Sequence, residues 1–297
     1  MQNNSLRNKI IVITGASSGF GKGAALEFAK EGASLVLAAR RDELIEELAA
    51  QCRAAGARAT AVPADVSLRE DVERLAQEAV REHGRIDVWI NNAGVGALGP
   101  FERIPIEDHE QVIRTNLMGT LYGCYYVYRL FLTQNAGTII NVASELGAHT
   151  VPYYSSYTAA KHGVVGLGDA LRQEIYVAGR KDIHVCTVMP TAHDTPFFDH
   201  AANYTGREVQ APQPLHDPQA VVDTLVRLAR DPKDREIVGS DGIVKVLLKK
   251  LMPGVEEKVA AKMMHRTQME KAPPAPESPN ALHEPMDVGT GVSAGRR

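Results

Sequence analysis

The feature that most constrains the fold is a regular alternation of short apolar runs with helical patterns across residues 5–240. Wholly apolar runs are typical of strands buried on both faces, and such strands occur in parallel sheets whose connections are helices. The alternation therefore predicts an α/β fold with a single doubly wound parallel sheet of about seven strands and helices on both faces. The strands are expected at residues 10–14, 34–39, 59–62, 86–90, 137–144, 183–188 and 236–238.

A glycine-rich turn, Gly15-Ala16-Ser17-Ser18-Gly19-Phe20-Gly21, follows the first strand and opens a helix predicted to end near Glu31. Glycines permit a tight turn and a close approach of the backbone to a diphosphate, and a helix N-terminus offers N–H donors. A turn required only for packing is the alternative, because a glycine loop alone has little specificity. Its place between a buried strand and a helix favours a nucleotide-binding loop.

Arg40 and Arg41 stand at the end of the second predicted strand. Chains of this kind that bind NAD place an acidic residue there, which bonds both ribose hydroxyls. Guanidinium groups suit a 2′-phosphate instead, so the pair favours NADP(H) over NAD(H). Alternatively, both arginines only begin the surface helix expected over residues 42–55.

Polar side chains follow three further strands. Asp65 comes after the third strand, where it could meet an adenine amino group or cap the helix expected over residues 67–83. The run Asn91-Asn92-Ala93-Gly94 closes the fourth strand, where amide side chains satisfy turn backbone and Gly94 admits a ligand. Ser144 ends the fifth strand. Because ligands in open α/β sheets bind outside the carboxyl ends of the strands, Ser144 is expected beside the site.

A long helical pattern over residues 105–134 contains Asn116, which is a poor choice for a helix interior. An Asn accepted there indicates a need for its side chain, or a local kink that holds a water. As a lone residue it is more simply explained as tolerated.

Tyr157 and Lys161 lie four residues apart on a helix predicted over residues 157–177, so they project from the same face. An ammonium group held there favours the phenolate form of the Tyr, whose ordinary pKa is about 10. The phenol could then exchange a proton near neutral pH. Alone, the pair is more simply explained as a solvated Lys beside a half-buried Tyr.

In this order, Thr14-Gly15-x-x-x-Gly19-x-Gly21, Asn91-Asn92-Ala93-Gly94, Asn116, Ser144 and Tyr157-x-x-x-Lys161 resemble the short-chain dehydrogenase/reductase family. The resemblance covers about residues 5–240 and implies a Rossmann-like fold. It implies that Tyr157 is the acid/base and that Lys161 lowers its pKa and holds the nicotinamide ribose. It also implies that Ser144 orients the substrate oxygen and Asn116 places a relay water. With the arginine pair, the expected cofactor contacts are Gly15, Ser17, Ser18, Gly19, Phe20, Gly21, Arg40, Arg41, Asp65, Val66, Asn92, Ala93, Gly94, Tyr157, Lys161, Pro190 and Thr195.

One departure from the family lies at Thr191, because members usually carry Gly after the residue equivalent to Pro190. The added Cβ bears on the backbone conformation near the nicotinamide. Thr195, by contrast, takes the position of the family's carboxamide-binding Thr.

The chain is expected to divide into three parts. Residues 1–250 form the NADP-binding catalytic domain, whose irregular loop 191–218 contacts substrate. Residues 251–271 form a helical extension, and residues 272–297 lack periodicity and are expected to be disordered. The mixed apolar and basic run 243–252 could pack on the domain, a partner subunit or a lipid surface. Near the site, an apolar pocket is expected from Val151, Tyr153, Tyr154, Phe197 and Phe198.

Composition excludes several classes of protein. Lys and Arg number 33 against 36 Asp and Glu, a net charge of -3, so no overall basic field attracts nucleic acid. Three scattered cysteines argue against a disulfide framework and a thiolate metal site, and they fit a reducing compartment. No signal peptide and no apolar run of about 18 residues is found, so no transmembrane segment is expected and the predicted location is cytoplasmic.

These observations predict an NADP(H)-dependent oxidoreductase that transfers a hydride between nicotinamide and a carbonyl or secondary alcohol, with no metal. An apolar ketone or alcohol is the expected substrate; steroid, retinoid, acyl and sugar-derived compounds stay open, as does the direction. The family resemblance implies a homodimer or homotetramer assembled through the two long helices. A catalytically silent nucleotide-binding sensor or scaffold is the alternative, and an isomerase or dehydratase that uses a tightly held cofactor is a third interpretation.

Overall fold

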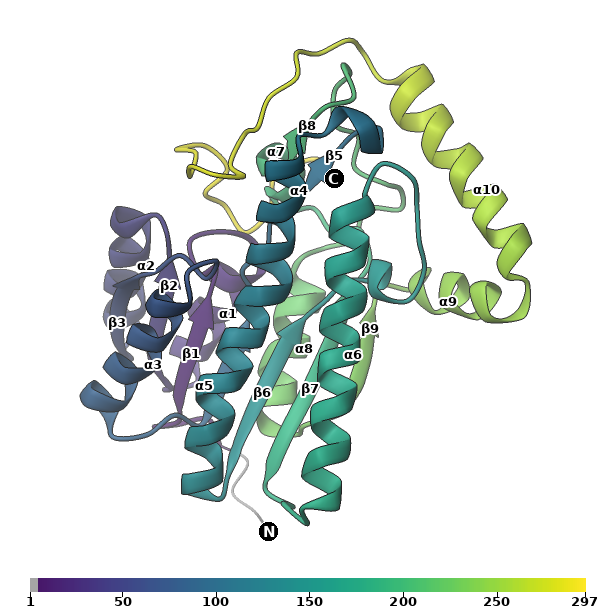
Figure 1. Ribbon diagram of the computed structural model, residues 1–297. Coiled ribbons are helices and arrows are strands. Elements are labelled where there is room, and N and C mark those ends of the chain that lie inside the picture. Colours follow the sequence, from purple (N-terminus) through teal and green to yellow (C-terminus); the bar gives the residue numbers. More distant parts are fainter. Residues whose placement is uncertain (1–4) are drawn as a thin grey trace.

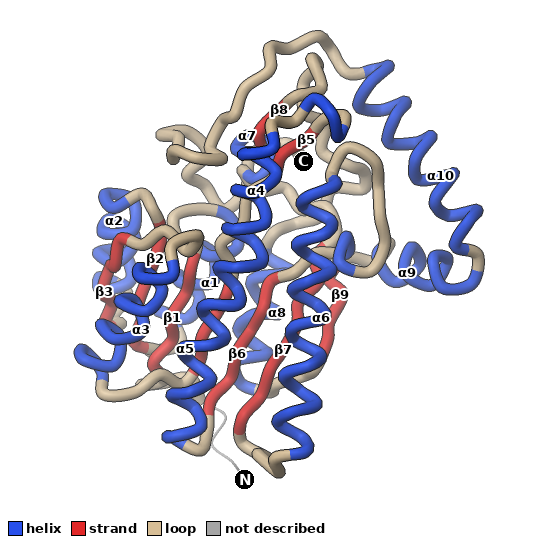
Figure 2. The backbone as a smooth tube through the Cα atoms, viewed as in Figure 1, coloured by secondary structure: helices blue, strands red, loops and turns tan. Residues whose placement is uncertain are grey.

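The computed structural model describes residues 5–297, except for the side chains of Val244, Lys250 and Pro253. Seven strands form one parallel sheet in the order β3-β2-β1-β4-β6-β7-β9, with helices on both faces (Figures 1 and 2). The predicted doubly wound α/β fold is confirmed. The strands are β1 (Ile10–Thr14), β2 (Ser34–Ala39), β3 (Arg58–Pro63), β4 (Val88–Asn91), β6 (Gly137–Val142), β7 (Ile183–Pro190) and β9 (Arg235–Val238).

Two helical layers enclose the sheet, each with its own apolar cluster. On one face pack α1 (Gly19–Lys30), α2 (Asp42–Ala54) and α8 (Gln219–Arg230). On the other face, which is the near one in Figure 1, lie α3 (Arg69–His83), α5 (Gly119–Gln134) and α6 (Ser155–Val177). Within β1, Ile11 and Ile13 face the first layer and Val12 faces the second, because successive side chains of a strand point to opposite faces. Burial on both faces explains why these strands have no polar alternation.

The helix expected over residues 105–134 is interrupted around Asn116, the residue that is a poor choice for a helix interior. α4 (Ile106–Ile113) passes into α5 through a π-helical turn at Arg114–Met118, which contains Asn116. The buried Asn116 amide donates from Nδ2 to Val95 O at 2.8 Å, and its Oδ1 accepts from Val95 N at 2.9 Å. The expected local distortion is therefore present, and Asn116 uses it to bind the segment after β4.

Short elements that the sequence did not predict shape the carboxyl edge of the sheet. β5 (Ala97–Leu98) pairs in parallel with β8 (Ala202–Asn203), next to the one-turn helix α7 (Phe197–His200). Two-residue strands are too short to leave a periodic pattern. Their pairing ties the loop after β4 to the loop after β7, at the edge where ligands bind in such sheets.

A helical arm, residues 242–265, follows the sheet. It consists of α9 (Gly242–Leu251) and α10 (Pro253–His265), and α10 stands apart from the body in Figure 1. A π-helical turn at Arg266–Lys271 ends the arm. Across the described part of the chain, no helix combines the length and apolarity needed to cross a membrane.

The structure differs from the expectation that residues 272–297 are disordered. This segment returns across the carboxyl edge of the sheet, where Asn203 and Ser278 exchange backbone hydrogen bonds of 2.8 and 3.0 Å. Leu282 is fully buried in an apolar cluster with Ala97 and Val112. The segment has no periodicity because it is ordered through its backbone groups and single side chains rather than through a regular apolar face.

Candidate active site

A cavity of about 610 Å³ opens at the carboxyl edge of the sheet. The glycine turn after β1, the ends of β2, β4, β6 and β7, the start of α6 and the inner side of the arm all contribute to its walls. It therefore joins the expected nucleotide loop to the Tyr157 helix, as predicted for a site that holds two reactants.

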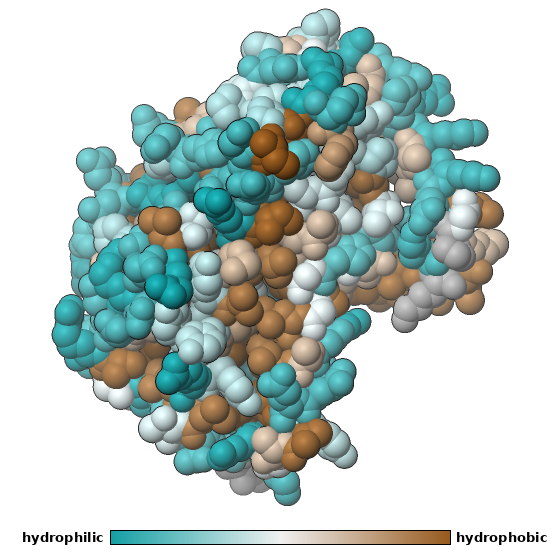
Figure 3. Space-filling view, in the orientation of Figure 1, coloured by the Kyte–Doolittle hydropathy of each residue, from teal (hydrophilic) through white to brown (hydrophobic). Residues whose placement is uncertain are grey.

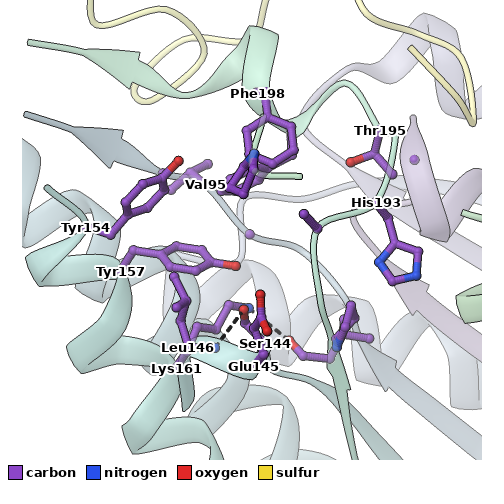
Figure 4. Close-up of a pocket in the computed structure, with 18 of the residues that line it drawn as sticks. Val95, Ser144, Glu145, Leu146, Tyr154, Tyr157, Lys161, His193, Thr195 and Phe198 are labelled. Atoms are coloured by element: carbon purple, nitrogen blue, oxygen red, sulfur yellow. Dashed lines mark hydrogen bonds between the residues drawn. The ribbon is translucent and has the colours of Figure 1, made fainter. Parts of the chain in front are cut away.

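Ser144, Tyr157 and Lys161 meet in this cavity (Figure 4). Ser144 follows β6 and begins a short 3₁₀ turn, where its Oγ accepts from Leu146 N at 3.2 Å. Lys161 lies one helical turn after Tyr157, and its Nζ donates to Val142 O at 2.9 Å. The same Nζ lies 5.5 Å from the centre of the Tyr157 ring. The side chains implied by the family resemblance are thus brought together by β6 and α6.

The protonation of this group differs from the simple expectation. Burial raises the pKa of Tyr157 to about 12, against an opposing hydrogen bond with Ser144. Burial also lowers the pKa of Lys161 to about 8, since a charged ammonium is costly away from water. Desolvation is the largest cause acting on the Tyr157 pKa, and it favours a Tyr157 that carries its proton at neutral pH.

The glycine turn is packed so closely that only glycine fits. A Cβ on Gly15 would lie 2.7 Å from Ala93 Cα, and one on Gly21 would lie 2.3 Å from Gly15 O. Asn92 fixes the turn, because its Nδ2 donates to the carbonyls of Thr14 and Gly15 at 3.0 and 3.1 Å. This close cradle leads directly to the N-terminus of α1 and fits a dinucleotide phosphate.

The two arginines after β2 have different partners. Arg41 Nη2 donates to Ser17 Oγ at 2.9 Å and Ser18 Oγ at 3.0 Å, so a guanidinium and two hydroxyls are grouped at one point. Arg40 instead donates to backbone carbonyls of the C-terminal segment, with Nη2 to Ala281 O and Nη1 to His283 O both at 2.6 Å. Both arginines line the cavity.

The other expected cofactor residues are distributed along the same wall. Asp65 Oδ1 accepts from Ser67 N at 2.8 Å, so the residue turns the chain toward α3 and lines the cavity as well. The remaining expected contacts that line the cavity are Phe20, Gly19, Val66, Ala93, Gly94, Pro190 and Thr195.

Asn116 is not among the lining residues. It lies behind Gly94, where an added Cβ would be 3.0 Å from Asn116 Oδ1. Both ends of its amide are occupied by Val95, so its visible role is to position the Gly94–Val95 segment.

Thr191, the departure from the family pattern, is accommodated by two glycines of the neighbouring segment. A Cβ built on Gly239 would lie 1.9 Å from Thr191 Oγ1, and one on Gly242 would lie 2.6 Å from Thr191 Cγ2. Thr191 keeps a negative φ, and its N–H donates to Val238 O at 2.9 Å. The Thr191 side chain points toward the segment that follows β9. The backbone beside the cavity therefore needs no glycine at position 191.

The substrate end of the cavity is mainly apolar. Val151, Tyr154, Phe197 and Phe198 line it as expected. Tyr153 does not; it has a φ of 70° and its hydroxyl contacts His265 Nδ1 at 2.6 Å. The arm adds an apolar wall that the sequence did not place here, made by Leu248, Met252, Val255, Val259, Met263 and Met264.

The sequence also did not predict a buried cluster of polar side chains at the substrate end of the cavity. The His149 ring lies 3.3 Å from Glu145 Oε2 and 3.6 Å from Glu256 Oε1, and all three side chains are buried. Lys245 pairs with Glu145 at 3.1 Å. These contacts attach the arm to the turn that carries Ser144. The sequence offered only local signals here, Glu145 beside Ser144 and His149 four residues later, because Lys245 lies 100 residues from Glu145.

Comparison with known proteins agrees with this geometry. The family model for short chain dehydrogenase matches residues 9–204. The uncharacterized oxidoreductase YxnA of Bacillus subtilis (strain 168) is 32% identical over 289 residues, which are 97% of this chain and 80% of that protein. The 3-oxoacyl-(acyl-carrier-protein) reductase FabG of Thermotoga maritima is 30% identical over 80% of this chain and 98% of its own length.

A solved structure extends the comparison. The short chain dehydrogenase/reductase from Burkholderia phymatum, in complex with NAD, has a TM-score of 0.70 and 28% sequence identity. The match includes 85% of this chain and 96% of that one. The chain therefore belongs to the short-chain dehydrogenase/reductase family of oxidoreductases, which act on CH–OH and C=O groups.

Proposed function

We propose that this protein is an NADP(H)-dependent oxidoreductase of an apolar ketone or secondary alcohol, with Tyr157 as the proton donor and acceptor. The observation that carries the proposal is the convergence of Ser144, Tyr157 and Lys161 in a cavity that continues to the glycine turn.

The protein's own residues handle the substrate oxygen and its proton. Ser144 orients the oxygen by a hydrogen bond, and the protonated Tyr157 donates to it as a carbonyl is reduced. Lys161 supplies a positive charge next to the phenolate that is left. Bound nicotinamide supplies or accepts the hydride. A positioned acid of this kind contributes about 10² to 10⁴ in rate.

The 2′-phosphate preference is supported by the grouping of Arg41 with Ser17 and Ser18, because a guanidinium and two hydroxyls can together donate to three phosphate oxygens. Lys161, Asn92 and Thr195 are the residues proposed to hold the nicotinamide half. Asp65 and Val66 are proposed to contact the adenine. Asn116 is proposed to act through the Gly94–Val95 segment.

An apolar substrate is supported by the aromatic side chains near Tyr157 and by the apolar wall of the arm. The name of the 3-oxoacyl reductase relative agrees with a carbonyl substrate. We further propose a homodimer or homotetramer, because apolar side chains gather over α5 and α6 in Figure 3, where Leu121 and Tyr125 are exposed.

The proposal is tested by titrating the protein with NADPH and NADH and then assaying a panel of apolar ketones. We expect NADPH to bind more tightly, Arg41→Ala to remove that preference, and Arg69→Ala, an exposed arginine paired with Glu70, to change nothing. Tyr157→Phe should abolish turnover and leave NADPH binding intact. Turnover retained in Tyr157→Phe would rule out its role, and cofactor binding without turnover on any ketone or alcohol would favour the sensor alternative.

A further inference from the structure

The C-terminal segment 280–297, here called the strap, lies along the whole nucleotide half of the cavity. In Figure 1 it runs from the arm across the carboxyl edge of the sheet toward α1 and α2. Its contacts follow the same path as the expected cofactor residues, from the arginines after β2 to Thr195.

At the adenosine end, the strap is held by its backbone carbonyls. Arg40 donates to the carbonyls of Ala281, Leu282 and His283, at 2.6, 3.2 and 2.6 Å. Arg41 also donates to Met286 O at 3.1 Å. A guanidinium presents its donors as a rigid planar fork, so several carbonyls held by one Arg fix the course of the backbone.

At the diphosphate end, the strap contacts the first turn of α1. Gly19 N donates to Gly291 O at 2.9 Å, and Lys22 Nζ donates to Thr290 O at 3.0 Å. Close approach here depends on Gly289, which has a φ of 68° and where a Cβ would lie 2.5 Å from His200 Nε2.

The end of the strap is fastened beside the nicotinamide position. Buried Asp194 accepts from Ser293 Oγ at 2.7 Å and from Arg296 N at 3.0 Å. Arg296 Nη1 also donates to Thr195 O at 3.0 Å. The strap therefore contacts the residue that is expected to bind the carboxamide.

The strap bounds an open cavity, although its Gly291 O takes one donor of the glycine turn, the Gly19 N–H. Ala281, Pro285 and Met286 line the same 610 Å³ space as Ser17 and Arg41. A segment that replaced the cofactor would fill this space, whereas one that encloses a bound cofactor leaves it empty.

We propose that the strap is a wall of the cofactor site that closes over bound NADP(H), so that the cofactor enters and leaves only when the strap undocks. This inference rests on the proposed function. Ala281, Pro285 and Met286 are assigned to contact the adenosine half, and Arg40 is assigned to hold the strap rather than the phosphate. Closing segments of this kind commonly limit the rate of ligand release.

The test is the dissociation rate of NADPH, measured by stopped-flow fluorescence with excess NADP⁺ as the competitor. A chain that ends at Val288 keeps the Arg40 contacts and loses those to Gly19, Lys22 and Asp194. We expect its dissociation rate to rise at least about tenfold, with faster association as well. Arg297→Ala, which removes only an exposed pair with Asp217, should leave the rate unchanged.

A milder variant and a second measurement keep the test valid if the chain that ends at Val288 misfolds. The pair Ser293→Ala and Arg296→Ala keeps the chain length and should change the rate in the same direction. Hydrogen exchange provides the second readout, because amides of residues 281–293 should gain protection when NADPH is added. Unchanged dissociation rates in both variants, or tighter NADPH binding by the shortened chain, would overturn the strap as a closing wall. A full-length chain that binds no nicotinamide cofactor would instead overturn the proposed function, and the strap with it.

Discussion

Two regions of the molecule are held in place by different interactions. One is the carboxyl edge of the sheet with Ser144, Tyr157 and Lys161, here called the catalytic edge. The other is the C-terminal region that encloses it, which consists of the arm and the strap. Ser144, Tyr157 and Lys161 come from a buried strand end and a long helix, whose packing positions each side chain. The enclosing region is held by arginines on carbonyls, by the His149 contacts and by single apolar anchors such as Leu282. From this difference we expect a rigid candidate catalytic edge and an enclosing region whose contacts open separately.

The largest expected effect is a loss of turnover, accompanied by a gain in stability, when Lys161 at the catalytic edge is replaced. Lys161→Met should lower turnover by about 10² to 10⁴-fold, since the positive charge beside Tyr157 is lost. It should also raise the free energy of unfolding at pH 7 by about 1 to 2 kcal/mol, because removing a buried ammonium outweighs leaving Val142 O without its donor. Activity assays and denaturant unfolding of the cofactor-free protein measure the two quantities.

The pH dependence of the free energy of unfolding provides a control for this prediction. Because burial lowers the pKa of Lys161 from 10.5 to about 8, the unfolded chain binds more protons between these values, and wild-type stability gains from this group as pH rises through them. Lys161→Met should lack that gain. A variant less stable than wild type at pH 7 would show that neighbouring groups already compensate the charge.

The next prediction tests whether Gly239 is needed to make room for the Thr191 side chain. Gly239→Ala combines a φ of 122° with a clash against Thr191 Oγ1, and we expect a loss of about 2 to 4 kcal/mol in the free energy of unfolding. Gly56→Ala is the matched control, because its φ is 93° and no atom lies within 4 Å, so it should cost about 1 kcal/mol. Adding Thr191→Gly should restore about half of the loss in Gly239→Ala, as expected for residues in contact. Simple additivity of the two changes would contradict the clash.

A smaller effect is expected where the arm meets the catalytic edge. Glu256→Gln weakens the contact of α10 with His149 and loosens the apolar wall, so KM for an apolar substrate should rise about 3 to 10-fold with little change in kcat. Glu257→Gln, which changes an exposed residue of the same helix that pairs with Lys249, is the control. A fall in kcat with constant KM would show that His149 acts on the chemical step instead.

The smallest effect is expected from the native cysteines. Burial raises the pKa of Cys52 to about 11 and those of Cys124 and Cys186 to about 12, so none should react with iodoacetamide in the folded protein at pH 8. Intact-protein mass spectrometry should show no adduct and unchanged activity, and three adducts after denaturation. A cysteine introduced at Ser293 should react faster than all three, which compares the two regions directly. Equal rates would mean that the strap is as closed as the core.

The sheet and the convergence of the candidate catalytic residues in one cavity could be predicted because their signals are local. A strand buried on both faces requires a continuous apolar run, and Tyr157 and Lys161 share a helix face at a fixed spacing. Asn116 also gave a correct local signal, since its poor helix propensity coincides with the π-helical turn.

The enclosing region could not be predicted, because its contacts join distant residues and use backbone groups. Arg40 finds its carbonyl partners more than 240 residues away, and any residue type provides a carbonyl. His149 and Glu256 give no pattern until α10 is folded against the Ser144 turn. The Tyr157 pKa also depends on burial, which spacing alone does not report.

The fit between Thr191 and its glycine neighbours has a consequence for how related chains vary. The space at this point holds one side chain. Thr191, directly after β7, contributes it here, while Gly239 and Gly242 contribute none. Relatives with a side chain at position 191 should therefore keep glycine at 239 and 242. Glycine at 191 removes the Thr191 contact at both positions and leaves the φ of 122° as a remaining reason for glycine at 239. Among relatives, a side chain at 239 or 242 should therefore occur only together with glycine at 191, although 48 residues separate positions 191 and 239 in the chain.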